Sequence, residues 1–334
     1  MKDASLSRRN FIKAAGVGAG VVAGTALLSG AVGLDHSLAA TDNEAKAVDP
    51  VLSGVSDIHV HAAPDVGPRL INELSFATEA KNAGYRAVMF KSNEWSCHDR
   101  AFLVREALPG FECFGSLCMN LAHGEKVNVH AAEKATTTTG KLCRCIWMPT
   151  QAAEYQVTLE KKPWKSIPVL SATGNVLPEV VRVMEICAEA DIIFATGHSS
   201  PEESVVLARK AKEVGVKKFV VTHANSRIWR MTREQVMTVA DLGGYIEYSY
   251  ISCLWGPGTG LAHFERRTNE DFIAYAQIVP ERSFISTDMG QVGLPHPVDA
   301  MRTCIMAMRE GGVPQKDIDI MVRTNPAMLM GLEA

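Results

Sequence analysis

Two histidines, His59 and His61, stand one residue apart at the end of a short apolar run in the segment SDIHVHAAPD. Side chains at positions i and i+2 of a β-strand point to the same face of the strand. Both imidazoles can therefore reach one site, and imidazole is a usual ligand of zinc and related divalent ions. A single histidine in a strand is more often packed and hydrogen-bonded than bound to metal, so the pair needs support from elsewhere in the chain.

Three further residues with metal-binding side chains follow later in the sequence. His198 lies in TGHSS, His223 in VVTHAN and Asp288 in STDMGQ, and each of these segments ends a short apolar run. Four of the ten histidines thus fall at the ends of three predicted strands, with an aspartate at the end of the last. This joint pattern favours a metal site over four separate packed histidines.

A site of this kind needs a scaffold that brings distant strand ends together. From Val55 onward, short β-rich runs alternate with longer amphipathic stretches, and the near-continuous apolar runs are typical of parallel strands buried on both faces. The predicted strands are Ser56–His61, Ala87–Lys91, Glu112–Cys118, Arg144–Thr150, Ile192–His198, Lys218–His223, Tyr245–Tyr250 and Phe284–Asp288. The predicted helices include Leu74–Ala83, Pro178–Ala190, Pro201–Val214, Thr232–Leu242 and Asn269–Ile278.

Eight strand–helix units in residues 55–334 predict an α/β fold, a (β/α)8 TIM barrel. The alternative is an open doubly wound sheet, but no glycine-rich phosphate turn follows the first predicted strand. In a barrel, functional side chains lie at the carboxyl ends of the strands, which is where these candidate ligands fall.

The segments DIHVH, TGHSS, VVTHAN and STDMGQ, with the C-terminal RTNPAMLMGL, resemble the amidohydrolase superfamily of metal-dependent barrel enzymes over residues 55–332. Within it, DIHVHAAPD, AVMFKSN, IWMPT and STDMGQ look most like a poorly characterised branch. The resemblance implies one or two divalent ions, with zinc expected. A divalent ion lowers the pKa of bound water from 15.7 to about 7. The implied ligands are His59, His61, His198, His223 and Asp288, and Asp288 is also the implied general base.

One feature departs from that pattern. Two-metal members of the superfamily often carry a carboxylated lysine or a glutamate at the fourth strand, but here the predicted fourth strand ends in IWMPT. Lys91, at the end of the second predicted strand, is the substitute in the predicted metal site. It could bridge two ions as a carbamate, hold an anionic substrate group as a cation, or only extend its ammonium to the strand end.

Two arginines are candidate substrate-binding residues. Arg69 follows the first predicted strand and Arg227 follows the sixth. Either could hold a carboxylate or phosphate with two parallel hydrogen bonds. A solvated loop arginine is an equally good interpretation of each.

These residues predict a metal-dependent hydrolase that cleaves a C–N or C–O bond of a small molecule, such as an amide, cyclic amide, ester or lactone. One alternative is a metal-dependent decarboxylase or C–C-cleaving enzyme of the same superfamily. The other is a non-catalytic periplasmic protein that binds a metal or another ligand.

The whole chain has ordinary globular composition: 334 residues, 47% hydrophobic and 21% charged, with a formal net charge of −3. Nothing in this balance indicates a nucleic-acid-binding surface. Eight cysteines show no CxxC pair and mostly lie inside apolar segments, which predicts small core residues.

The N-terminus resembles a twin-arginine export signal. Arg8 and Arg9 precede a Gly/Ala-rich run over residues 14–33, and SLAA ends at Ala40. We therefore expect a signal over residues 1–40 cleaved near Ala40, a linker over 41–54 and the barrel over 55–334. The mature protein is then expected in the periplasm, with the twin-arginine machinery as a partner and no stable membrane span. A homo-oligomer is compatible with the sequence.

Overall fold

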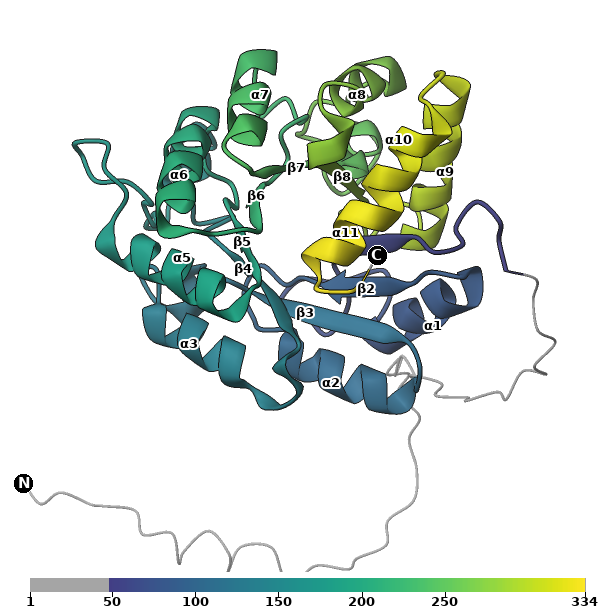
Figure 1. The fold of residues 1–334 in the computed structure, drawn as a ribbon, viewed down its shortest axis with the longest axis horizontal. Coiled ribbons are helices and arrows are strands. Elements are labelled where there is room, and N and C mark those ends of the chain that lie inside the picture. The colour runs from purple at the N-terminus through teal and green to yellow at the C-terminus, as the bar shows by residue number, and fades with distance from the viewer. Residues whose placement is uncertain (1–47, 334) are drawn as a thin grey trace, which may run out of the picture. The chain divides into compact units, whose positions relative to one another are not determined.

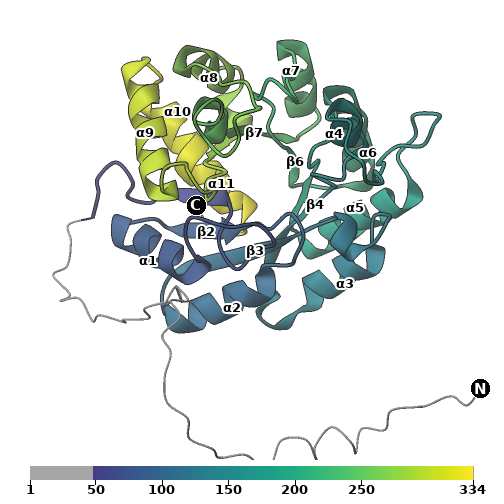
Figure 2. The ribbon, with the colours of Figure 1, turned by 180° about the vertical axis from the view of Figure 1, so that it is seen from behind.

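A computed structural model describes residues 48–333, and the predicted export signal lies outside them. Eight parallel strands form one sheet in which each strand pairs with the next in sequence order. Figures 1 and 2 show the helices arranged around the outside of these strands from two opposite sides. The strands are β1 (Ser56–Val60), β2 (Ala87–Phe90), β3 (Glu112–Cys118), β4 (Cys143–Trp147), β5 (Ile193–Ala195), β6 (Phe219–Val221), β7 (Tyr245–Ser249) and β8 (Ser283–Ser286).

Helices follow the strands and cover the barrel. The α-helices are α1 (Glu73–Ala83), α2 (His98–Ala107), α3 (Val129–Thr137), α4 (Glu154–Leu159), α5 (Pro178–Ala190), α6 (Pro201–Val214), α7 (Arg233–Asp241), α8 (Asn269–Ala276), α9 (Pro297–Glu310), α10 (Gln315–Asp319) and α11 (Asn325–Leu329). Short 3-10 turns cover Leu121–His123, Thr139–Lys141, Tyr250–Cys253 and Pro280–Arg282, and a π-helical turn covers Ile320–Thr324. The predicted TIM barrel is confirmed.

Helix boundaries follow the local signals in the sequence. Ser200 caps α6 with a reciprocal capping box to Glu203, and Gly215 ends it in the left-handed conformation at φ 89°. Two of the predicted helices, α5 and α6, have the predicted bounds. No helix within residues 48–333 is both long and apolar enough to cross a membrane.

The predicted strands are all present, but most end before the residues of interest. β5 ends at Ala195, three residues before His198, and β8 ends at Ser286, two residues before Asp288. Both His223, at φ 58°, and Asp288, at φ 53°, have left-handed backbone, so the chain departs from a regular strand at these residues. His198, His223 and Asp288 therefore lie in the turns that follow their strands, whereas His59 lies within β1 and His61 directly after it.

The barrel closes between β1 and β8. The His61 N–H donates to the Met289 carbonyl at 2.8 Å, and the Asp288 N–H donates to the His59 carbonyl at 2.9 Å. Two residues before His59 in β1, the fully buried carboxylate of Asp57 accepts hydrogen bonds from the N–H and the hydroxyl of Thr287 at 3.2 and 2.5 Å. This seam joins residues at opposite ends of the described chain.

The C-terminal segment RTNPAM holds the seam from outside, with α11 in contact with both β1 and β8. Arg323 donates to the carbonyls of Ser53 and Val51, just before β1, at 2.8 and 2.9 Å. Asn325 donates to the carbonyl of Ser283, the first residue of β8, at 2.7 Å. The motif thus has a structural role at the seam.

Two glycines beside the candidate ligands are required by close backbone approach. A Cβ atom on Gly290, at φ 118°, would lie 1.6 Å from the His61 carbonyl oxygen. A Cβ atom on Gly197, at φ 62°, would lie 2.2 Å from the Met148 carbonyl oxygen. The glycines in TGHSS and STDMGQ therefore permit the turns that carry His198 and Asp288.

The cysteines are free thiols, as the composition predicts for core residues. All are buried except Cys253, which is partly exposed. Burial raises the pKa of the Cys118 thiol to about 11, so it is protonated at neutral pH.

We expect Gly197→Ala to destabilise the fold more than Gly110→Ala. Both glycines have left-handed backbone, at φ 62° and 78°, which costs alanine about 1–2 kcal/mol. Only Gly197 has backbone atoms where the new methyl group would lie, and overpacking adds about 1–3 kcal/mol. Urea unfolding of the two variants measures the difference, and equal losses of unfolding free energy would contradict this account.

Candidate metal centre

A cavity of about 150 Å³ opens at the carboxyl ends of the strands. Polar side chains line one part of it, and Trp229, Trp255 and Phe264 form an apolar wall. Of the predicted site residues, six line this cavity: His61, Arg69, Lys91, His198, His223 and Asp288. His59 lies beneath them and is fully buried.

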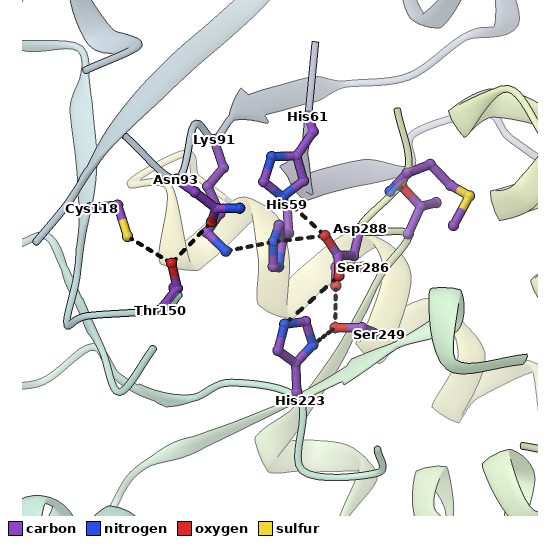
Figure 3. Close-up of polar contacts among 12 residues, drawn as sticks. His59, His61, Lys91, Asn93, Cys118, Thr150, His223, Ser249, Ser286 and Asp288 are labelled. Atoms are coloured by element: carbon purple, nitrogen blue, oxygen red, sulfur yellow. Dashed lines mark hydrogen bonds and ion pairs between the residues drawn. The ribbon is translucent and has the colours of Figure 1, made fainter. Parts of the chain in front are cut away.

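Three side chains converge as a candidate ligand set. One donor atom from each of His59, His223 and Asp288 lies within 4.8 Å of the other two. Figure 3 shows the three side chains facing one another. The Nε2 atoms of His59 and His223 lie 3.0 and 3.7 Å from the two carboxylate oxygens of Asp288. Ligands of a tetrahedral ion with bonds of about 2.0–2.1 Å lie about 3.3 Å apart, so this donor set fits a divalent cation.

The buried carboxylate of Glu247, in β7, orients His59. Glu247 Oε1 lies 2.7 Å from His59 Nδ1 and accepts its proton, which directs Nε2 toward Asp288. Burial alone would raise the pKa of Glu247, but the charge and hydrogen bond of His59 lower it below its usual value. An ionised carboxylate behind an imidazole fixes the ring and strengthens the opposite nitrogen as a metal ligand.

The same carboxylate also orients His223 through two serines. Ser286 donates its hydroxyl proton to Glu247 Oε1 at 2.7 Å, so its oxygen is left to accept from Ser249 at 3.2 Å. Ser249 in turn accepts from His223 Nδ1 at 2.9 Å, as drawn in Figure 3. This direction of donation leaves the lone pair of a neutral His223 on Nε2, facing Asp288. Burial lowers the pKa of His223 to about 4, which favours the neutral ring.

His198 has a comparable support but lies outside the three-residue set. Gln156 donates its amide N–H to Glu160 at 2.9 Å, so its oxygen accepts from His198 Nδ1. The ring centroid of His198 lies 5.2 Å from that of His223 and 4.2 Å from the Trp229 ring. Burial lowers the pKa of His198 well below its usual value, so Nε2 again carries a lone pair.

His61 is bonded differently from the other three histidines. Arg69 Nη2 lies 3.2 Å from His61 Nδ1, and because a guanidinium can only donate, Nδ1 accepts. The proton of the neutral ring then lies on Nε2, 3.1 Å from Asp288 Oδ1. Burial, with the Arg69 charge, lowers the pKa of His61 to about 3. His61 thus lies beside the ligand set as a donor to Asp288, and a ligand role for it stays a prediction.

Lys91 reaches the centre of the site from the end of β2. Its Nζ lies 3.0 Å from His59 Nε2 and 4.6 Å from the centroid of the Trp147 ring, and the side chain is almost completely buried. Lys91 therefore lies in the site, where the sequence placed it. Whether Lys91 binds metal or substrate stays a prediction.

The two predicted substrate-binding arginines lie in different places. Arg69 lines the cavity, but Asp65 accepts from its Nε and Nη2 at 2.8 and 2.6 Å. Arg227 is not among the residues that line the cavity. Its Nε instead lies 3.0 Å from a carboxylate oxygen of Glu265, and its side chain is 34% exposed.

The sequence interpretation missed the residues that orient the histidines, chiefly Glu247, Ser249 and Gln156. A signal was present in YIEYSY, because strand alternation places Glu247 and Ser249 on one face and Tyr248 on the other. Tyr248 packs against Tyr275, at 6.1 Å between ring centroids, in the core. A glutamate in an otherwise apolar buried strand indicates an internal partner.

Backbone strain coincides with the candidate ligands. Of the five residues other than glycine with positive φ among those described, His223 and Asp288 are both in the three-residue set. Such conformations cost about 1–3 kcal/mol each and persist where the surrounding structure enforces them. Asp288 also has a pKa well below its usual value, because His59 and His61 outweigh the opposing effect of burial.

Comparison with known proteins gives a family and a fold. The model of a family described as "Family of unknown function (DUF6282)" matches residues 54–247, more than half of the chain. No curated protein sequence matches the chain significantly.

Solved structures with similar folds include proteins named as hydrolases. A triple mutant of the organophosphorus hydrolase from Deinococcus radiodurans has a TM-score of 0.56 at 14% identity, covering 85% of this chain and 95% of that one. An amidohydrolase from Pseudomonas aeruginosa has a TM-score of 0.55 at 10% identity, covering 84% and 97%. A dihydroorotase has a TM-score of 0.52 at 14% identity, covering 84% and 70%. The resemblance to amidohydrolase barrels is thus confirmed for the fold.

We expect Glu247→Ala to lower the free energy of unfolding by about 3–5 kcal/mol, because it leaves the buried His59 and Ser286 donors without an acceptor. Glu247→Gln should cost less than half as much, since an amide oxygen can replace Oε1. The measurement is urea unfolding in excess chelator, so that metal binding does not contribute. Equal losses for the two variants would show that the acceptor at Oε1 is unimportant.

Proposed function

Since this chain belongs to the family of unknown function DUF6282, we propose from its site that it is a metal-dependent hydrolase of small molecules. The bond cleaved would be a C–N or C–O bond, as in an amide, cyclic amide, ester or lactone. The observation that carries the proposal is the convergence of His59, His223 and Asp288 within 4.8 Å at the floor of a cavity.

The proposed ligands of one divalent ion, most simply zinc, are the Nε2 atoms of His59 and His223 and the carboxylate of Asp288. His198, His61 and Lys91 line the same cavity, and their role as further ligands remains a prediction from the sequence. When bound, the ion would lower the pKa of a water molecule and polarise the substrate carbonyl or equivalent group.

Asp288 has the properties of a general base. Its carboxylate is ionised, and its two oxygens lie 3.0 and 3.7 Å from the Nε2 atoms of His59 and His223, beside the proposed position of the ion. It would take the proton of the attacking water and return it to the leaving group. The backbone at φ 53° and the hydrogen bond from the Asp288 N–H to the His59 carbonyl hold it in this position.

Hydrolysis is favoured over C–C cleavage and over ligand binding alone. The similar folds include structures named as an organophosphorus hydrolase, an amidohydrolase and a dihydroorotase, which support this choice. The same similarity supports an enzyme over a binding protein, because these structures are named as enzymes.

We expect the purified protein to hold about one equivalent of divalent metal per chain, and His59→Ala and His223→Ala to lose it. Removing a ligand removes a large part of the binding free energy of a three-residue site. The control is His130→Ala, because the His130 side chain is 90% exposed on α3, and this variant should keep the metal. Elemental analysis after dialysis against zinc measures the content. A folded wild-type protein without stoichiometric metal would refute the proposal.

Asp288→Asn separates an enzyme from a binding protein. Loss of a general base lowers the rate by roughly 10²–10⁴-fold. Because Asp288 is also a proposed ligand, rates are compared per bound zinc, with the zinc content of each protein measured by elemental analysis. We expect ester or lactone hydrolysis to fall by this factor in zinc-loaded protein, measured with p-nitrophenyl acetate and dihydrocoumarin as probes. Unchanged hydrolysis with the metal retained would contradict the role of Asp288.

A further inference from the structure

One wall of the cavity contains a network of polar side chains outside the ligand set. Asn120 lies just after β3, Thr150 after β4 and Asn93 after β2, and Asn93 lines the cavity. Asn120 and Thr150 are buried, with relative exposures of 1% and 0%. Figure 3 shows Thr150 bonded to Asn93, which lies beside Lys91.

Backbone groups fix the orientation of the Asn120 amide. Its oxygen accepts from the backbone N–H groups of Thr150 and Ala152 at 2.9 and 3.1 Å. Its nitrogen donates to the backbone carbonyl of Asn93 at 2.6 Å. Backbone N–H groups only donate and carbonyls only accept, so the Asn120 amide has one possible orientation.

This orientation passes to Asn93 through Thr150. The Asn120 nitrogen also donates to Thr150 Oγ1 at 2.6 Å, so the threonine hydroxyl has its own proton available to donate. That proton goes to Asn93 Oδ1 at 3.1 Å, since the other neighbour, Cys118 Sγ at 3.4 Å, is a weak acceptor. The Asn93 oxygen thus faces Thr150 and accepts its proton, whereas Asn93 Nδ2 has no hydrogen-bond partner among residues 48–333. The group that Asn93 can offer to the cavity is an N–H donor.

Two cationic side chains that line the same cavity are donors as well, and one of them, Lys91, lies beside Asn93 in Figure 3. Lys91 carries three N–H bonds, of which His59 can accept one, and Arg69 can only donate. If the bound ligand group carried both an acceptor and a donor, as an amide does, its donor would face an N–H donor of the protein. A carboxylate, which only accepts, matches this wall.

We propose that Asn93 is a specificity-determining residue that donates a hydrogen bond to an acceptor-only oxygen group of the substrate, a carboxylate in the first instance. Asn120 and Thr150 are positioning residues that set the direction of this donor. The inference rests on the proposed function for the identity of the cavity as the substrate site, but the donor wall does not need the metal.

The test compares benzoate with benzamide, which have nearly the same shape. Benzamide replaces one acceptor oxygen by an NH2 donor, and the ring can contact the apolar wall of Trp229 and Trp255. Dissociation constants are measured by titration calorimetry on the full chain, in zinc-loaded and in chelator-treated protein. We expect benzoate to bind about tenfold or more tightly than benzamide in both forms, because a hydrogen bond to a charged group is strong.

Variants of Asn93 and Thr150 test the direction of donation. Asn93→Asp turns the donor into an anionic acceptor, so benzoate affinity should fall about tenfold or more and the preference should shrink or invert. Thr150→Val removes the donated proton and should weaken the preference, whereas Thr150→Ser should restore it. The control is Asn82→Asp, the same change on the exposed surface of α1, which should leave binding unchanged.

Several results would overturn the inference. These are a wild-type protein without the preference, an Asn93→Asp variant that keeps it, or Thr150→Ser behaving like Thr150→Val. A preference seen only with zinc would assign it to the metal and not to Asn93. A protein that binds no zinc but keeps the preference would refute the proposed hydrolase and leave the role of Asn93 intact.

Discussion

Closure of the barrel between its first and last strands is the constraint on which the site depends. Asp57 and Thr287, which lie 230 positions apart in the sequence, are joined by buried hydrogen bonds. One residue pair further along, the backbones of His59 and Asp288 are bonded directly. The relative position of an imidazole and a carboxylate is thus set by main-chain pairing, with Gly290 allowing the two turns to touch. Arg323 and Asn325 of the segment RTNPAM stabilise the same junction of β1 and β8 by hydrogen bonds to backbone carbonyls.

Burial gives the polar groups around this seam a definite direction. A buried donor or acceptor without a partner is costly, so each hydroxyl and amide is oriented by its neighbours. Glu247, which can only accept when ionised, sets the proton positions on His59 directly and on His223 through two serines. Backbone groups do the same for Asn120. In both cases a group that can only donate, or only accept, a hydrogen bond fixes whether a more distant side chain offers a donor or an acceptor.

Much of the scaffold could be predicted from the sequence, because strand alternation and helix caps are local signals. The eight strands, the helices α5 and α6, and the positions of His198, His223 and Asp288 at strand ends follow from such patterns. Distant contacts could not be predicted in this way. Arg69 meets Asp65 and His61, and the ring of His61 is consequently turned into a donor. Arg227 follows a strand just as Arg69 does, but its loop directs it to Glu265.

The seam also imposes an order in time on the site. During synthesis the two histidines of DIHVH emerge early, whereas β8 and Asp288, which follows it, emerge long after them. A nascent chain therefore has imidazoles before it has the complete set of donors. Under the proposed function, an ion held by all three residues would mark a chain in which β8 has already joined β1.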